Sequence, residues 1–187
     1  EAETAKAIEN TQRDLNIALF NEILILSKKM NLNFNEIIKL ASTKWNFIKF
    51  QPGLVGGHCL PVDPYYLSYI AEKNKFRTNT LLSGRSTNNK MKNYVISEIL
   101  KCIKKNRLNE KAKILILGIS YKYGVSDLRN SLGLKIFNKI KKKYRNTFFY
   151  DPFVNIKYKL TNIEKLKNFK LIIFLSPGKK YKSIFKK

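Results

Sequence analysis

The sequence predicts an α/β protein in which an all-helical part precedes a small part built on a parallel sheet. Two observations lead to this prediction. Up to about residue 106, apolar residues recur at three- and four-residue steps, the pattern of amphipathic helices. After residue 112, short apolar runs alternate with a helical pattern, and strands that alternate with helices form parallel sheets. A polar, charged stretch around residues 106–111 separates the parts, so we expect domains at 1–108 and 109–187.

Four helices are expected in the first part: over residues 3 to about 30, from about 35, after 63, and over 80–106. Asn35 is placed to cap the second helix. Asp63 is the expected cap of the third, with Pro64 in its first turn. Cys102 lies in the apolar stripe of the fourth helix and is expected to be structural.

The first helix carries more apolar residues than one packing face requires. One stripe consists of Ile8, Leu15, Leu19, Ile23, Leu26 and Met30, while Ile17, Ala18, Phe20, Leu24 and Ile25 spread over other faces. We therefore expect this helix to pair with a second copy of the chain in a homodimer.

The second part is predicted to form a strand at 113–118, a helix at about 131–144, a strand at 147–150, a short helix near 163–166 and a strand at 171–175. The loop 118–131 follows the first strand and precedes a helix. Parallel sheets hold phosphate groups at such positions. The alternative is an ordinary polar loop.

Length and composition restrict the class of protein. The chain has 187 residues, of which 44% are hydrophobic, enough to build a core. No apolar run reaches the roughly 18 residues of a membrane span, and the first residues do not resemble a signal peptide. The two cysteines stand in unrelated contexts, which fits a reducing cytoplasm better than a disulfide framework.

The net charge of +24 invites comparison with nucleic-acid-binding proteins. Lysines occur in every segment, however, and no zinc-finger spacing or RNA-binding aromatic signature accompanies them. We therefore expect nonspecific attraction for polyanions and no specific nucleic-acid partner.

The stretch 50–63 is the most distinctive in the chain, with three of the eight glycines and two of the five prolines. Gly53, Gly56 and Gly57 permit unusual backbone angles and a close approach by a ligand. Cys59 follows the glycine pair, and Asp63 lies four residues further on. A thiol, a carboxylate and a glycine-lined approach suit a nucleophile site. The alternative is a tight turn with an inert thiol.

Lys6, Asn10 and Arg13 lie on one stripe of the first helix, so that an amine, an amide and a guanidinium succeed one another along it. For an isolated helix, a solvated polar face would be the simpler interpretation. The spacing of Cys59 and Cys102 suggests no metal site.

Residues 45–67 closely resemble the active-site loop of the UDP-glucose/GDP-mannose dehydrogenase family. The Val-Gly-Gly-His-Cys and Val-Asp-Pro-Tyr-Tyr-Leu pieces are similar to the branch that acts on UDP-N-acetylhexosamines. Residues 3–13 and 20–22 match the family's Lys-x-x-x-Asn helix. Residues 118–131 resemble the Tyr-Lys…Asp-x-Arg-x-Ser motif of its UDP-binding domain.

The resemblance implies a helical dimerisation domain, a Rossmann-like UDP-binding domain, and a homodimer through the first helix. It implies an NAD-dependent, two-step oxidation of a UDP-N-acetylhexosamine to the uronic acid, for surface polysaccharide synthesis. Cys59 would form a thiohemiacetal and then a thioester, Lys6 and Asn10 would stabilise the oxyanion, and Asp63 would assist a water. The resemblance gives substrate binding to Arg13, Phe50, Gly53, Gly56, Gly57, Tyr121 and Lys122, and NAD binding to Arg129.

The sequence also departs from the family pattern. It contains no Gly-x-Gly-x-x-Gly, so we expect it to be the second half of such an enzyme, with an incomplete last domain and no activity alone. Thr43 and Trp45 stand where mannosamine-type enzymes have His and Arg, which favours a glucosamine or galactosamine substrate. The alternatives are a dimerisation and nucleotide-binding module without turnover and a basic polyanion-binding protein.

Overall fold

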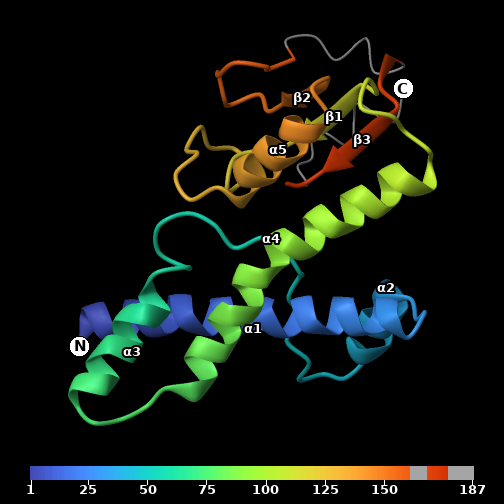
Figure 1. Ribbon diagram of the computed structural model, residues 1–187. Helices are drawn as coiled ribbons and strands as arrows, with labels where there is room; N and C mark the ends of the chain where they lie inside the picture. The colour runs from blue at the N-terminus through green and yellow to red at the C-terminus, as the bar shows by residue number, and fades with distance from the viewer. Residues whose placement is uncertain (161–167, 177–187) are drawn as a thin grey trace. The chain divides into compact units, whose positions relative to one another are not determined.

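The computed structural model describes residues 1–160 and 168–176 (Figure 1). Its elements, in order, are α1 (Ala2–Lys29), α2 (Phe34–Ala41), α3 (Asp63–Lys73), α4 (Asn79–Lys105), β1 (Ile114–Leu117), α5 (Leu132–Lys143), β2 (Thr147–Tyr150) and β3 (Leu171–Phe174). The expected fold class, a helical part followed by a small parallel sheet, is confirmed. The short helix expected near residues 163–166 lies outside the described residues.

The chain divides into two compact units. The first consists of Glu1–Val55 and Cys59–Met91, and the second of Gly56–His58 and the chain from Lys92 onward. Helix α4 begins in the first unit and ends in the second. The three residues 56–58 of the glycine-rich loop thus belong to the second unit, although both of their flanking segments belong to the first.

Two helix caps differ from the prediction. Helix α2 is capped by Asn33, whose side chain accepts the N–H groups of Asn35 (3.0 Å) and Glu36 (3.4 Å). The predicted cap, Asn35, is already inside the helix, because the half-buried Phe34 joins its first turn. Asp63 is likewise the first residue of α3, and Val62 occupies the cap position without a side-chain bond.

Helix α1 has its polar face buried and much of its apolar stripe exposed. The buried residues of α1 are Asn10, Thr11, Asp14, Ala18, Phe20, Asn21 and Ser27, which are mostly polar. On the opposite side, the exposed fractions of the apolar residues are 56% for Ile8, 52% for Leu19, 56% for Leu26 and 57% for Met30. A helix in water normally shows the reverse arrangement.

The second unit is built on a three-stranded parallel sheet with the strand order β2-β1-β3. All four residues of β1 are buried, as expected for the central strand of a parallel sheet. Helix α5 packs on β2, where the rings of Phe137 and Phe149 meet edge to face with centroids 5.4 Å apart. Leu115 and Leu117 face a second apolar cluster that includes Phe148 and Phe169.

Candidate active site

Cys59 lies on the exposed loop that leads into α3. Its carbonyl oxygen accepts the N–H groups of Val62 (3.0 Å) and Asp63 (2.9 Å), so the chain turns tightly from the cysteine into the helix. Pro64 occupies the first turn of α3, where N–H groups have no partner within the helix, so the N–H that proline lacks costs no hydrogen bond. The thiol is free and open to solvent.

The side chains of Asn10 and Asp63 are in direct contact. Asn10 lies on the buried face of α1, with 6% of its surface exposed, and donates to Asp63 Oδ2 at 2.6 Å. Helix α3 packs on α1, and this packing places the first residue of α3 against the helix. The structure therefore brings together three of the four residues predicted to be catalytic, namely Cys59, Asp63 and Asn10. Asp63 is bonded through its backbone to Cys59 and through its side chain to Asn10.

The two basic residues of the predicted stripe point to solvent. Lys6 is exposed, and its ammonium binds Glu9 at 2.7 Å, one turn further along α1. Within the described residues, no hydrogen bond or ion pair joins Lys6 to Cys59. Arg13 is also exposed. The amide of the predicted stripe is thus inside the unit, while the amine and the guanidinium are outside it.

The amino-terminal end of the loop is fixed at Gly53. The carboxamide of Asn21, which is fully buried on α1, donates to the Gly53 carbonyl at 3.0 Å and accepts the Gly53 N–H at 2.8 Å. Just before it, the ring of Phe50 packs against Phe20, with centroids 6.2 Å apart. A side chain at position 53 would meet nothing within 4 Å.

A buried polar network, which the sequence-based prediction missed, supports Asn21. Asn21 donates to Asn88 Oδ1 (2.8 Å), and Asn88 donates to both the main-chain oxygen and Oδ1 of Asp14 (2.9 and 2.7 Å). Arg85 forms an ion pair with Asp14, and the side chains of both residues are almost entirely buried. Burial raises the pKa of Asp14, although the neighbouring Arg85 and Asn88 oppose this shift. The available signal was the recurrence of polar residues at helical spacing at positions 10, 14 and 21.

In the second unit, Gly56 and Gly57 lie against the loop that follows β1. A Cβ on Gly56 would come within 2.8 Å of the Asn130 carbonyl oxygen, and one on Gly57 would come within 2.8 Å of the Tyr121 ring. Gly57 also has a φ of +89°, whereas neither Gly53 nor Gly56 has a positive φ. The prediction of unusual backbone angles therefore holds only for Gly57, and Gly56 is required by close approach instead.

His58, which was not among the predicted site residues, joins this cluster. Its Nε2 lies 3.0 Å from Asp127 Oδ2, and its ring meets that of Tyr121 edge to face at 6.4 Å. The side chain of Asn130 donates to the Gly57 carbonyl at 3.3 Å. A histidine beside the cysteine was visible in the sequence, but its acidic partner lies 69 positions away.

Asp127 also binds Arg129, the residue predicted to contact NAD. Arg129 donates from its main chain (2.9 Å), from Nε and from Nη2 (2.8 Å) to the Asp127 carboxylate. The hydrogen bonds from Arg129, followed by that from His58, hold the pKa of Asp127 well below its usual range. Asp127 in turn raises the pKa of Arg129. Of the two residues predicted to bind the nucleotide sugar, Tyr121 is half-buried in this cluster and Lys122 is exposed.

Asp151, at the end of β2, fixes the start of the same loop. Its Oδ2 accepts the N–H groups of Ile119 and Ser120, both at 3.1 Å, and the Ser120 hydroxyl at 2.9 Å. Three bonds to one buried carboxylate oxygen hold the chain as it leaves β1 at the carboxyl edge of the sheet. This is the position at which open parallel sheets bind ligands.

The described part of the chain contains no grouping of His, Cys, Asp and Glu side chains suited to a metal ion. Nor does it contain a helix of the length and apolarity that crossing a membrane requires.

Comparison with known proteins places both units in one family. The family model of the UDP-glucose/GDP-mannose dehydrogenase central domain matches residues 1–90, and that of the same family's UDP-binding domain matches residues 115–187. The chain belongs to the UDP-glucose/GDP-mannose dehydrogenase family. Its recognition from the loop and helix motifs is thereby confirmed.

Individual members of the UDP-glucose/GDP-mannose dehydrogenase family support this assignment. The chain is 43% identical over 155 residues to a UDP-N-acetyl-D-glucosamine 6-dehydrogenase of Pseudomonas aeruginosa, covering 82% of this chain and 37% of that protein. It is 35% identical to a UDP-N-acetyl-D-mannosamine dehydrogenase of Methanococcus vannielii, covering 100% of the chain and 43% of the relative. The chain therefore spans less than half the length of these relatives.

A solved structure of the UDP-glucose/GDP-mannose dehydrogenase family has the same fold. The chain superposes on a UDP-D-ManNAc dehydrogenase from Pyrococcus horikoshii with a TM-score of 0.83 and 32% identity, covering 99% of this chain and 45% of that one. The succession of a helical part and a small parallel sheet along the chain is thus shared with this relative.

Proposed function

We propose that this chain is the central and carboxyl-terminal part of an NAD-dependent dehydrogenase that oxidises a UDP-N-acetylhexosamine to the corresponding uronic acid. The observation that carries the proposal is the linkage of Cys59, Asp63 and Asn10 within one unit, on the segment that matches the family's central domain. An exposed thiol, a carboxylate and a buried carboxamide suit a thioester route from an aldehyde to an acid, with NAD as the oxidant.

In this proposal Cys59 is the nucleophile. Its thiolate adds to the carbonyl carbon of the intermediate aldehyde, forming a C–S bond and a thiohemiacetal whose oxidation leaves a thioester. Bound NAD supplies the chemistry of each oxidation, which is to accept a hydride from the substrate carbon. The exposure of the Cys59 loop leaves the thiol accessible to a ligand of this size.

Asn10 and Asp63 have complementary roles in this scheme. One N–H of the Asn10 carboxamide is committed to Asp63 Oδ2, and its second N–H is oriented by that bond for an oxyanion on the substrate. Asp63 Oδ1 takes a proton from the water that attacks the thioester, and the thiol of Cys59 leaves with a proton. Lys6 can contribute positive charge at this site only by exchanging its bond to Glu9 for one to the substrate.

The nucleotide-sugar and NAD contacts are assigned to the second unit, together with the loop glycines. Tyr121 and Lys122 are proposed to bind the nucleotide sugar, and Tyr121 packs directly against the backbone of Gly56 and Gly57. Arg129 fits a role toward NAD, because its side chain is 74% exposed and its bonds to Asp127 leave the Nη1 donors unused. Arg13, Phe50 and Gly53, which belong to the first unit, keep the substrate-binding role that the family resemblance gives them.

The proposed substrate class is supported by the relatives and by one local departure. The relatives include both UDP-N-acetylglucosamine and UDP-N-acetylmannosamine dehydrogenases. Thr43 and Trp45 stand where the family resemblance implies His and Arg in mannosamine-type enzymes, which supports a glucosamine or galactosamine configuration. The domain limits 1–108 and 109–187 and a homodimer through α1 belong to the same proposal.

The test is the complete protein that contains this chain, assayed for NAD reduction with UDP-N-acetylglucosamine and UDP-N-acetylgalactosamine. Acid formation is expected with at least one of these sugars and is expected to disappear in Cys59→Ser, because an oxygen ester cannot replace the thioester route. Cys102→Ser is the control, since Cys102 lies half-buried on α4 and, within the described residues, its sulfur accepts one hydrogen bond, from Asn106. Normal acid formation by Cys59→Ser would refute the assignment.

A further inference from the structure

The anchoring of Gly53 depends on a single side chain. Asn21 binds both main-chain polar groups of Gly53, at 2.8 and 3.0 Å, six positions before Cys59. Gly53 has no side chain, and a Cβ built there would meet no described atom within 4 Å beyond its chain neighbours, so its own attachment is through the main chain. These two hydrogen bonds fix the Gly53 backbone itself to α1, next to the ring contact between Phe50 and Phe20.

In the polar network that supports Asn21, the donor and acceptor role of each side chain is determined by the next. Arg85 can only donate and an ionised Asp14 can only accept, so the amide nitrogen of Asn88 must face Asp14. The oxygen of Asn88 then faces Asn21 and takes one of its N–H groups. The remaining N–H and the oxygen of Asn21 are left for the carbonyl and the N–H of Gly53. The buried ion pair thus sets the orientation of both carboxamides and, through them, of the loop backbone.

Stability alone does not account for this arrangement. A buried ion pair seldom stabilises a fold more than apolar residues of the same volume would. Within the described residues, moreover, Asp14 Oδ2 and Arg85 Nε have no hydrogen-bond partner. What the polar network provides, and an apolar core could not, is directional hydrogen bonding to a loop.

The other end of the loop is held by the same helix. Asn10, eleven positions before Asn21 on α1, binds the side chain of Asp63 at 2.6 Å. At about 1.5 Å of rise per residue, the two anchors are roughly 16 Å apart along the helix axis. The segment from Gly53 to Asp63 would reach about 33 Å if extended. The loop is therefore held to α1 at both ends and is longer than their separation requires. Cys59 lies within it, directly after His58, which is bonded to Asp127.

We propose that Asn21 is a positioning residue for Cys59: oriented by Asn88, Asp14 and Arg85, it fixes the amino-terminal end of the loop, as Asn10 fixes the carboxyl-terminal end. This inference rests on the proposed function, since it assumes that Cys59 must be presented to a substrate. Asn21 touches no reacting atom and acts only through the Gly53 backbone.

The first measurement is amide hydrogen exchange on this chain. Asn21→Ala is expected to raise the exchange rate of the Gly53 N–H at least ten-fold, and Asn88→Ala is expected to do the same without contacting Gly53. Asn21→Ser is the milder variant should Asn21→Ala not fold, because its hydroxyl is too short to bridge both main-chain groups. Exchange at Gly53 that matches the wild type in folded Asn21 variants would overturn the proposal, and so would unchanged exchange in Asn88→Ala.

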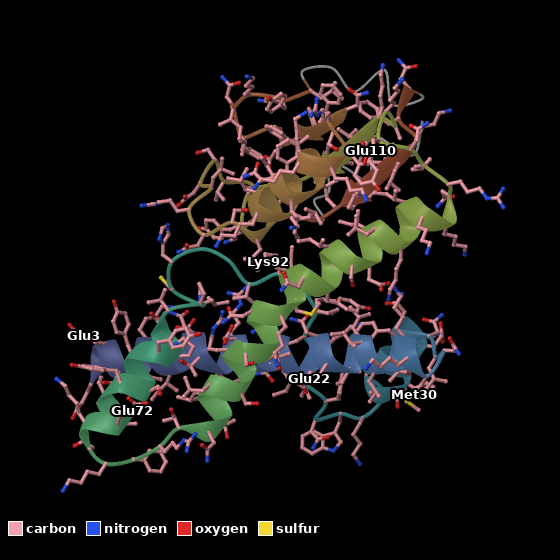
Figure 2. The ribbon with its side chains drawn as sticks, viewed as in Figure 1. Glu3, Glu22, Met30, Glu72, Lys92 and Glu110 are labelled. Atoms are coloured by element: carbon pink, nitrogen blue, oxygen red, sulfur yellow. The ribbon has the colours of Figure 1, made fainter. Side chains whose placement is uncertain are left out.

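Two matched variants separate positioning from simple loss of stability. Thr87→Val removes a neighbouring hydrogen bond between α4 and α1, the 2.8 Å bond from Thr87 to Glu22. Glu22 is labelled in Figure 2, and this bond does not involve the loop. Met91→Ala removes buried volume from α4 without removing a polar contact. Both are expected to leave the Gly53 exchange rate within about two-fold of the wild type. An increase equal to that of Asn21→Ala would show a structural effect only and would overturn the proposal.

The second measurement concerns the thiol and its activity. With a trifluoromethyl reagent on Cys59 in a Cys102→Ser background, the ¹⁹F signal of the wild type is expected to be a single line, and that of Asn21→Ala to split or broaden. In the complete protein, Asn21→Ala is expected to lower kcat roughly 10–100-fold with KM within about three-fold, as a misplaced reacting group does. An unchanged ¹⁹F line would overturn the proposal, whereas an inactive wild type would refute only the proposed function.

Discussion

Gly57 is the residue at which the backbone of the candidate site tolerates least change. Its φ is +89°, and a Cβ would lie 2.8 Å from the Tyr121 ring. Gly57→Ala is therefore expected to reduce the free energy of unfolding by about 1–3 kcal/mol, the usual range for a strained backbone position. Gly53→Ala is the matched control, expected to stay within about 0.5 kcal/mol because that site is open. Urea denaturation measures both, and equal losses would contradict the prediction.

Asp127 gives the site a pH dependence whose sign can be stated. Its pKa is depressed below the ordinary value of 3.8 in the folded chain, chiefly by hydrogen bonds from Arg129. The folded state therefore favours the ionised carboxylate, and this contribution to stability is complete above the ordinary value and is lost as the pH falls below it. The difference in unfolding free energy between the wild type and Asp127→Asn should thus be largest above pH 5 and shrink below about pH 3.8. A difference that stays constant from pH 6 to pH 3 would contradict this.

The sequence was informative for the residues to which the family resemblance gives a role. The loop 50–63 and the pair Asn10 and Asp63 were recognised from composition and resemblance, and the structure joins that pair at 2.6 Å. His58 and Asn21 were not recognised, because the partners that give them a role lie 69 and 67 positions away in the sequence. That the predicted residues act on a substrate is still a prediction.

At the scale of elements, helix boundaries were predicted well and caps were not. The helices predicted over 3–30 and 80–106 correspond to α1 and α4, because apolar periodicity over several turns is a strong signal. The choice between Asn33 and Asn35 as the cap of α2 depended on whether Phe34 joins the helix, a matter of tertiary packing. The outward orientation of the apolar stripe of α1 could not be inferred, since both faces of α1 have helical spacing.

The cap assignment can be tested by two substitutions in the same turn. Asn33→Ala removes the acceptor of two N–H groups of α2 and is expected to cost about 1 kcal/mol of stability. Asn35→Ala changes an exposed residue inside the helix, where Ala is a better helix former, and is expected to be neutral or slightly stabilising. Thermal unfolding of the two variants in parallel distinguishes them. A larger loss for Asn35→Ala would reverse the assignment.

The exposed stripe of α1 supports the proposed homodimer. Contiguous apolar surface on a helix whose other face is already buried indicates a partner, and a two-fold pairing of identical helices is the simplest one. Leu19→Glu combined with Leu26→Glu is expected to convert a dimer into a monomer in sedimentation equilibrium. Lys29→Glu, on the same helix, is the control for added negative charge. A wild-type chain that is monomeric at high micromolar concentration would refute the pairing.

At the scale of the whole molecule, the fold class could be predicted because two patterns divide the chain: helical periodicity before residue 106, and short apolar runs alternating with a helix after residue 112. The membership of residues 56–58 in the second unit could not be predicted. It depends on contacts of Gly56 and Gly57 with Tyr121 and Asn130, which no local pattern encodes.

The net charge of +24 has its own consequence for the whole molecule. A protein with this excess of Lys and Arg attracts the phosphate backbone of DNA by releasing counterions, and such binding carries no sequence information. We expect two 20-base-pair duplexes of unrelated sequence to bind with equal affinity at each salt concentration, and the logarithm of the binding constant to fall linearly with that of the salt concentration. Fluorescence anisotropy between 50 and 300 mM NaCl measures both quantities. A reproducible preference of ten-fold or more for one duplex at fixed salt would show base-specific contacts. The Lys and Arg residues would then form a specific nucleic-acid interface, and would not be the general excess of lysine that the sequence indicates.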